Sequence, residues 1–320
     1  MSEVSLFRSY MNTDARNAAG TAPIQPLFDS INGLKDKNEL ATFFGKNQKN
    51  GVGSPLAFYI SVDGKDSTRY ATHIWQTGLG LPDRDYYTNT DAKSIEIRSQ
   101  YVAHITRMLQ FLGDEQPAAR SQAEMILAFE TTLASPRLDK VQSRDFRNFN
   151  NPRTMVQLQE MVPAISWRQA LKDFGVEKQL DTLIVMQPKY MEVLQNTFAT
   201  GDVDTWKMVM RWATFNNATG QLTTKIEKAN WDFYSKTLSG AKKQRPADER
   251  ALATVNGSVG EALGKLYVDE MFPPEAKQKA EKMIINVIAA YQDRIMALDW
   301  MSEETKTKAV EKLNKFTVKI

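Results

Sequence analysis

The side chains that most often carry catalysis are scarce in this sequence. Its 320 residues include two histidines, His73 and His104, and no cysteine. A catalytic zinc site of the hydrolytic type needs two histidines one helical turn apart, a glutamate between them to activate water, and a further acidic ligand. Neither histidine stands in a His-Glu-x-x-His sequence. We therefore predict no catalytic residue and no metal ligand in this chain, and we interpret both histidines as structural or surface residues.

Other reactive patterns are also missing from the sequence. There is no cysteine nucleophile, no glycine-rich phosphate loop after a strand and no Gly-x-Ser-x-Gly elbow. No feature selects a serine that one of the histidines could activate. An enzyme with a different active site of its own is accordingly the least favoured interpretation.

The most distinctive segment is Gly80-Leu81-Pro82-Asp83-Arg84-Asp85-Tyr86-Tyr87, a glycine and proline bend dense in charges and aromatic rings. Glycine permits unusual backbone angles, proline fixes a turn, and an arginine between two acids can satisfy the polar groups of a buried loop. A catalytic role for Asp83 or Asp85 would require a partner acid or a metal, which the sequence does not indicate. We interpret the following residues as a structural motif: Gly80, Leu81, Pro82, Arg84, Asp85, Tyr86 and Tyr87.

Hydrophobic periodicity indicates the elements that position this segment. Apolar residues alternate over 58–62 and again over 70–74 around an Asp-Gly turn, which predicts a β-hairpin at about residues 56–76 directly before the motif. Most of the remaining chain shows helical spacing, for example over 97–112 and 119–133. The predicted fold class is mainly α, a multi-helix domain with one small β-hairpin.

Residues 255–320 predict three consecutive amphipathic helices. Pro273 and Pro274 separate the first from the second, and Ser302 caps the third, for which we expect a core face of Ala309, Leu313 and Phe316. No glycine, proline or polar tail closes the third helix before Ile320. The expected apolar face of the second helix consists of Ile284, Val287, Ile288, Tyr291, Ile295 and Leu298.

Composition excludes several function classes. The chain is 42% hydrophobic and 25% charged with a formal net charge of +3, which is typical of a soluble globular protein. It has no concentrated basic stripe with base-stacking aromatic residues, so we predict no nucleic-acid partner. No apolar run approaches membrane-spanning length, and the start Met1-Ser2-Glu3 is not that of a signal peptide.

Several of these segments resemble one family of enzymes. The stretches 80–87, 255–257, 262–268 and 298–306 are similar to consecutive landmarks of the neprilysin and endothelin-converting-enzyme family of zinc metalloendopeptidases. Asn256 is one of the matching positions. The resemblance runs from near residue 1 to Ile320 and implies the non-catalytic N-terminal portion, which ends before the zinc-binding motif.

This resemblance carries several expectations. Residues 1–300, with the hairpin, would form a helical cap domain that encloses the substrate chamber and restricts access to oligopeptides. Residues 301–320 would form a helix leading into the catalytic zinc domain, which is absent from this chain, so the chain alone should be inactive. Zinc and peptide substrates would belong to the parent protein, with the missing catalytic domain as a partner and a periplasmic or extracellular location.

Two further points follow from the resemblance. Segment 144–150 is loosely similar to a family segment in which an arginine precedes Tyr-Asn, and Phe149 stands where tyrosine is usual. Arg144 and Arg147 either face the substrate cavity or bind helix ends, and the second role is the commoner one for such pairs. The alternative to a peptidase portion is a free-standing helical interaction or regulatory module without enzymatic activity, which should have a polar surface.

Overall fold

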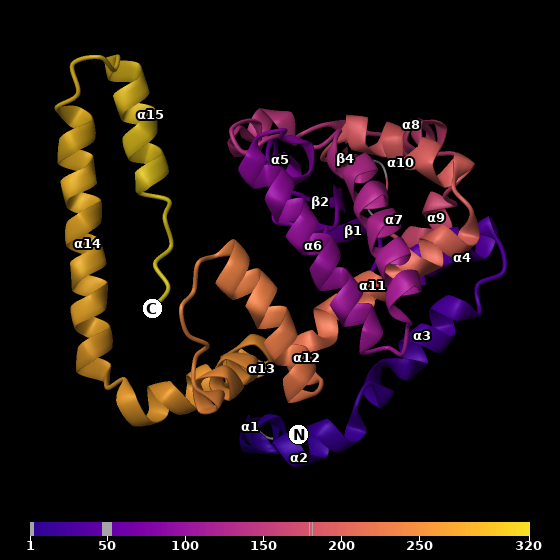
Figure 1. Ribbon diagram of the computed structural model, residues 1–320. Coiled ribbons are helices and arrows are strands. Elements are labelled where there is room, and N and C mark those ends of the chain that lie inside the picture. Colours follow the sequence, from indigo (N-terminus) through magenta and orange to yellow (C-terminus); the bar gives the residue numbers. More distant parts are fainter. Residues whose placement is uncertain (1–2, 47–52, 179, 181) are drawn as a thin grey trace. The chain divides into compact units, whose positions relative to one another are not determined.

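The protein is described here from a computed structural model, in which residues 3–46, 53–178, 180 and 182–320 are defined. The chain forms two compact units (Figure 1). The larger unit is Asn12–Gln244, and the smaller unit combines Met1–Met11 with Arg245–Ile320. The predicted boundary near residue 300, between a cap domain and a helix leading into a catalytic domain, stays a prediction.

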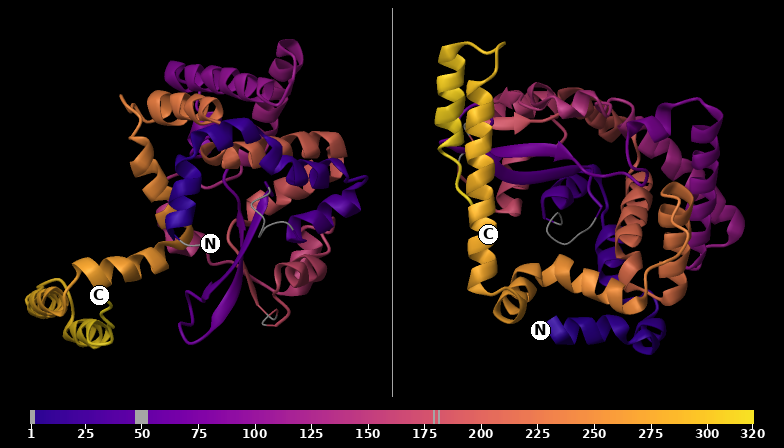
Figure 2. Two further views of the ribbon diagram at one scale, coloured as in Figure 1. Left: turned by 90° about the horizontal axis from the view of Figure 1, so that it is seen from below. Right: turned by 90° about the vertical axis from the view of Figure 1, so that its left-hand side faces the viewer.

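A four-stranded sheet lies in the larger unit, with the strand order β1-β2-β4-β3. Strands β1 (Leu56–Val62) and β2 (Tyr70–Gln76) pair antiparallel and form the long hairpin seen in Figure 2. The short strand β4 (Leu183–Val185) runs parallel to β2, and β3 (Pro152–Arg153) runs antiparallel to β4.

The mainly α fold class and the hairpin predicted at residues 56–76 are confirmed, and β3 and β4 are two short strands that the sequence did not indicate. Both of these strands are too short to show an alternating pattern, and all three residues of β4 are buried.

Helices surround this sheet and form the rest of the larger unit. The long helices predicted from the periodicity over 97–112 and 119–133 are confirmed as α6 and α7, which pack side by side (Figure 1). The helices of this unit are α2 (Thr13–Ala19), α3 (Gln25–Asn32), α4 (Lys37–Lys46), α5 (Arg84–Thr88), α6 (Ala92–Gln110), α7 (Gln116–Ala134), α8 (Met155–Met161), α9 (Trp167–Phe174), α10 (Pro188–Thr200), α11 (Val203–Ala218) and α12 (Thr224–Trp231). A π-helix, Asp232–Leu238, continues α12.

Two hydrophobic clusters hold the larger unit together. The first lies against the sheet and includes the fully buried Phe44, Ile74 and Trp167. The second lies among α6, α7, α11 and α12 and includes Tyr101 and Trp212. Because apolar burial is the main favourable term in folding, these clusters fix the helices that surround the Gly80–Tyr87 segment.

The smaller unit is built from α1 (Glu3–Met11), α13 (Ala247–Met271), α14 (Pro274–Met296) and α15 (Glu303–Leu313). Its helix boundaries largely agree with the sequence. The second predicted helix begins at Pro274, and the Ser302 side chain accepts a hydrogen bond from the Thr305 backbone as the cap of α15. Helix α15 folds back along α14 (Figures 1 and 2).

Two details of the smaller unit differ from the prediction. Helix α13 is broken at Val259, whose φ of −137° and ψ of 35° are not helical; a Gly-Ser pair precedes this valine, a usual cause of kinks. Helix α15 ends at Leu313, with Asn314 as its C-cap, and does not continue to Ile320. Phe316 consequently lies beyond the helix, exposed, and does not join Leu313 in the core.

Candidate functional site

The Gly80–Tyr87 segment is held by close contacts with α6 and α7. A side chain on Gly80 has no room, since its Cβ would lie 1.5 Å from the Tyr101 hydroxyl. Asp83 caps α5 by accepting a hydrogen bond from the Asp85 backbone at 3.0 Å. Arg84 donates to the Arg137 carbonyl at 3.2 Å. The segment therefore presents its backbone and Tyr87 toward the core.

The structure places the remaining motif residues at different depths. Leu81 is buried, and its backbone N–H donates to the Tyr87 hydroxyl at 2.7 Å. Pro82 is exposed at the turn, and the half-exposed Tyr86 carries the Lys140 ammonium 5.6 Å from its ring centroid. Asp85 lies 3.5 Å from the Arg84 guanidinium at the surface. None of these contacts involves a partner acid at reaction distance.

Glu130 in α7 is the polar centre of this region. Tyr87 donates to its Oε2 at 2.8 Å, Tyr101 donates to the same oxygen at 3.0 Å, and the Gly80 backbone N–H donates to Oε1 at 3.3 Å. The Trp212 indole in turn donates to the Tyr101 hydroxyl at 3.1 Å. Side chains of α5 and α6 and the motif backbone thus donate hydrogen bonds to one carboxyl group on α7.

The electrostatics of Glu130 follow from its burial. Its side chain is 3% exposed, and removal from water raises the pKa of this carboxyl to about 7, although the hydrogen bonds from Tyr87 and Tyr101 oppose that shift. Burial also raises the pKa of the Tyr101 and Tyr87 hydroxyls well above 10, so both remain protonated donors. At neutral pH the carboxyl populates both protonation states.

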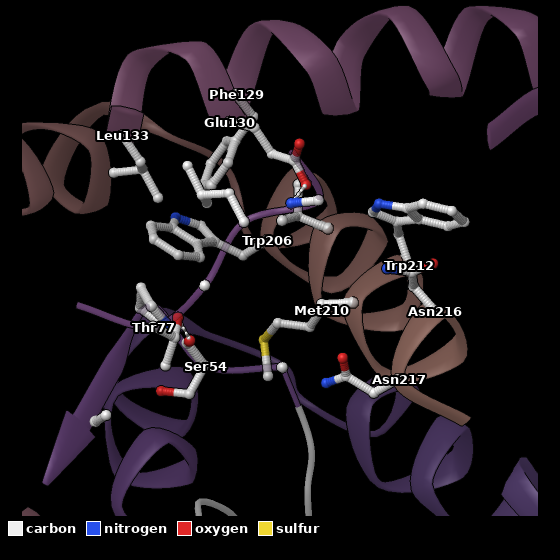
Figure 3. A pocket seen from close by; sticks show the side chains of 18 residues that line it. Ser54, Thr77, Phe129, Glu130, Leu133, Trp206, Met210, Trp212, Asn216 and Asn217 are labelled. Atoms are coloured by element: carbon white, nitrogen blue, oxygen red, sulfur yellow. Dashed lines mark hydrogen bonds between the residues drawn. The ribbon is translucent and has the colours of Figure 1, made fainter. Parts of the chain in front are cut away.

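A cavity of about 360 Å³ lies beside this network (Figure 3). Its walls come from the start of β1, the segment after β2, α7 and α11, and Figure 3 shows Glu130 and Phe129 above Met210. The lining side chains are mostly apolar, with two indoles, Trp206 and Trp212, and the amides of Asn216 and Asn217. A cavity of this size with few polar groups is typical of a site for a small ligand.

The region on the far side of Tyr101 is aromatic and contains one histidine. The π-helix places Phe233 flat against His104, with 4.7 Å between the ring centroids, and the Tyr234 hydroxyl accepts a hydrogen bond from Asn216. Burial lowers the pKa of His104 to about 3, so its ring is neutral. A π-helical turn often marks a functional segment. Here the turn places the rings of Phe233 and Tyr234 beside the residues that surround Glu130.

The residues present do not fit a zinc site. Across 3–46, 53–178, 180 and 182–320, no group of three or more His, Cys, Asp or Glu side chains could hold a metal ion. His73 in β2 is stacked on Tyr59 at 5.0 Å and its Nδ1 lies 3.1 Å from the Ala71 carbonyl oxygen. Each histidine is thus engaged by an aromatic ring and not by a second metal ligand.

The other predicted site residues lie elsewhere. Arg147 is exposed and pairs with Asp145 at 2.6 Å, and Arg144 is exposed at the end of a short 3₁₀ turn. Neither is among the described residues that line the Glu130 cavity, and their orientation toward a substrate chamber stays a prediction. Asn256 belongs to the smaller unit, in α13, where it borders a hollow together with Leu252 and Tyr267.

Glu130 was not singled out by the sequence reasoning, although a signal was present. It follows Ile126 by four residues and precedes Leu133 by three, so it stands on the apolar stripe of α7. A carboxylate on a core face is costly unless it is hydrogen bonded, and such a position therefore indicates a buried polar network.

Comparison with known proteins gives consistent results. Residues 3–320 match the family model described as peptidase family M13. Human endothelin-converting enzyme 1 is 28% identical over 261 residues, which are 80% of this chain and 34% of that enzyme. A Mycobacterium tuberculosis zinc metalloprotease, Zmp1, solved in complex with an inhibitor, superimposes with a TM-score of 0.89 at 34% identity over 98% of this chain and 47% of that one.

PepO from Lactobacillus rhamnosis superimposes with a TM-score of 0.87 over 98% of this chain and 49% of that one, and at 18% identity this likeness shows the fold alone. The chain thus spans about a third of the endothelin-converting enzyme and about half of each solved neighbour. None of the described helices has the length and apolar character needed to cross a bilayer.

Proposed function

This chain belongs to peptidase family M13, and from that membership we propose that it is the N-terminal helical portion of a neprilysin-like zinc endopeptidase. In this proposal it encloses the substrate chamber of the parent enzyme and restricts access to oligopeptides. Zinc and the hydrolysis of the peptide bond belong to a part of the parent protein outside this chain. The parent protein would act in the periplasm or outside the cell.

The observation that carries the proposal is the exposed apolar surface of α14. No residue of α14 is buried, although the helix is 23 residues long. It exposes the large apolar side chains of Met283, Val287 and Tyr291, which share one side of the helix at four-residue spacing, and that of Ile285, which is 62% exposed. Contiguous exposed apolar surface marks an interaction site, and the relatives of this chain are two to three times its length. We infer that α14 packs against the remaining part of the parent protein.

The packing of the larger unit supports the proposal that this portion restricts access by size. Exclusion by size needs a wall that does not yield, and interiors packed like this one resist deformation. Its three fully buried tryptophans, Trp167, Trp206 and Trp212, tie helices and sheet together. Size exclusion requires no reactive side chain in this chain.

The test compares this chain with the parent protein, obtained by extending the reading frame beyond Ile320. We expect the extended protein to contain His-Glu-x-x-His, to bind zinc in a one-to-one ratio and to cleave a short fluorogenic peptide. It should leave a folded protein of domain size intact. The 320-residue chain alone should bind no stoichiometric zinc and cleave neither substrate.

Two results would overturn the proposal. A stop codon directly after Ile320 would make the chain a free-standing helical interaction module, which keeps the same fold and family ancestry. Equal cleavage of the short peptide and the folded protein by the extended enzyme would remove the size-restricting role while leaving the peptidase itself in place.

A further inference from the structure

In the part of the chain that the structure describes, the buried carboxyl group of Glu130 forms no ion pair and no hydrogen bond with a cationic side chain. Its hydrogen-bond donors are two tyrosine hydroxyls and one backbone amide, all of them neutral. The charge of Arg137 lowers the pKa of this carboxyl, but that guanidinium donates to the Leu133 carbonyl and lies 5.1 Å from the Tyr190 ring centroid. A buried carboxylate normally requires a charged partner, so this one is incompletely compensated.

The hydrogen-bond count leaves room for one more donor. An ionised carboxylate offers about four acceptor positions, and a tyrosine hydroxyl carries one proton to donate. Tyr87, Tyr101 and Gly80 supply three protons in all, because the single Tyr101 proton is shared between Oε2 at 3.0 Å and Oε1 at 3.2 Å. The remaining acceptor position belongs to a residue that lines the cavity.

The cavity complements a positive charge carried on an apolar body. Trp206, Trp212 and Phe129 line it, and the faces of such rings attract cations. Met210 and Leu133 add apolar surface. Among the described lining residues there is no lysine, arginine or histidine, so these residues supply no counter-ion to Glu130. An anion would be repelled by Glu130, and a neutral apolar molecule would leave the acceptor position unused.

We propose that this cavity binds a small organic cation, an ammonium group attached to an alkyl or aryl body. The ammonium donates to the Glu130 carboxylate, and the apolar body lies between Phe129 and Met210. This site lies wholly within Asn12–Gln244, so the inference does not depend on the proposed peptidase role.

Binding of the organic cation should weaken in acid, because Glu130 then becomes protonated. The groups that act on it are the hydroxyls of Tyr87, Tyr101 and Tyr234 and the guanidinium of Arg137. The tyrosines keep their protons throughout the neutral range, because burial raises the pKa of each hydroxyl. The carboxyl is therefore the group of this set that titrates, and its protonation removes the charge that attracts the cation.

The experiment measures binding of benzylammonium and of benzyl alcohol, its neutral counterpart, to the 320-residue chain by calorimetry and by tryptophan fluorescence. At about pH 8 we expect benzylammonium to bind at least about tenfold more tightly than the alcohol, because charge-assisted hydrogen bonds are the stronger kind. The preference should disappear at about pH 5.5, where Glu130 is protonated.

Two variants locate the effect. Glu130→Gln keeps the shape of the side chain without its charge and should abolish the preference for the cation. Glu124→Gln changes an exposed carboxylate on the same helix, which pairs with Arg120, and should leave the preference intact. If Glu130→Gln fails to fold, the unmodified chain still tests the inference. Its preference for benzylammonium over benzyl alcohol, and the loss of that preference at about pH 5.5, are then the two results that matter.

Equal affinity for both probes, or no binding of either, would overturn the inference. So would an unchanged preference for benzylammonium in a folded Glu130→Gln variant.

Discussion

Trp167 and Trp300 are the same residue type in opposite surroundings. Trp167 begins α9 in the larger unit, is 0% exposed, and donates its indole N–H to the Val162 carbonyl. Trp300 follows α14 in the smaller unit and is 73% exposed. The larger unit thus completes its core from its own residues, whereas the smaller unit leaves apolar surface open. An apolar residue type in the sequence therefore marks both kinds of surface, and only its contacts in the folded chain distinguish a core from an interface.

The largest effect should come from removing the buried indole. Trp167→Ala should lower the free energy of unfolding by about 3–5 kcal/mol, because it deletes a large core side chain and leaves a cavity. Trp300→Ala should change it by at most about 0.5 kcal/mol, as is usual for exposed positions. Urea unfolding followed by circular dichroism measures both. Similar losses in the two variants would contradict the contrast between the units.

The next largest effect is a dependence of the unfolding free energy on pH, which arises from Glu130 in the larger unit. The pKa of Glu130 is about 7 in the folded chain and 4.5 in the absence of burial, so the folded state binds the proton more tightly than the unfolded state does. The resulting stabilisation is fully present below about pH 4.5 and is lost as the pH rises through about 7, a change on the order of 3 kcal/mol.

The measurement for Glu130 is the difference in unfolding free energy between the unmodified chain and Glu130→Gln, taken at several pH values. As the pH rises, the unmodified chain should lose stability relative to Glu130→Gln. The same subtraction with Glu124→Gln should show no such trend, because this carboxylate is exposed beside Arg120. A flat Glu130 difference would mean that the carboxyl is not desolvated as the geometry requires.

A smaller loss is expected from crowding the motif loop. Gly80→Ala introduces a Cβ 1.5 Å from the Tyr101 hydroxyl, and the necessary shift should cost about 1–3 kcal/mol. Gly78→Ala is the matched control, since its Cβ would meet no atom within 4 Å. Thermal unfolding of the two variants distinguishes them. An equally stable Gly80→Ala chain would show that the loop can move away from α6 without cost.

The sequence predicted the fold where patterns are long. Periodicity over 97–112 and 119–133 identified α6 and α7, and the Asp-Gly turn located the hairpin. It missed β3 and β4 because strands of two or three residues cannot show alternation, and β4 gains its place from pairing with β2. The break at Val259 was also missed, since the apolar face of α13 continues across it.

For the site, the sequence identified the motif but not its partner. The resemblance directed attention to Gly80–Tyr87, and the structure shows that Tyr87 reaches Glu130, 43 residues along the chain. No local pattern encodes such a contact, because it depends on how α6 and α7 pack around the loop. The cavity also depends on tertiary packing and not on a local pattern, since its walls come from four separate segments.

The smallest effect on stability is expected for a substitution on the exposed surface of α14, which tests whether that surface attracts a partner. Ile285→Lys on α14 should change the unfolding free energy by no more than about 0.5 kcal/mol, since the side chain it replaces is mostly in water. It should nevertheless reduce concentration-dependent self-association of the chain, because exposed apolar surface on α14 is then interrupted by a charge. Gln292→Lys adds the same charge at another exposed position of α14 and removes no apolar surface. Sedimentation velocity over a range of concentrations should therefore separate the two variants, and equal association in both would mean that the apolar surface of α14 is not what attracts a partner.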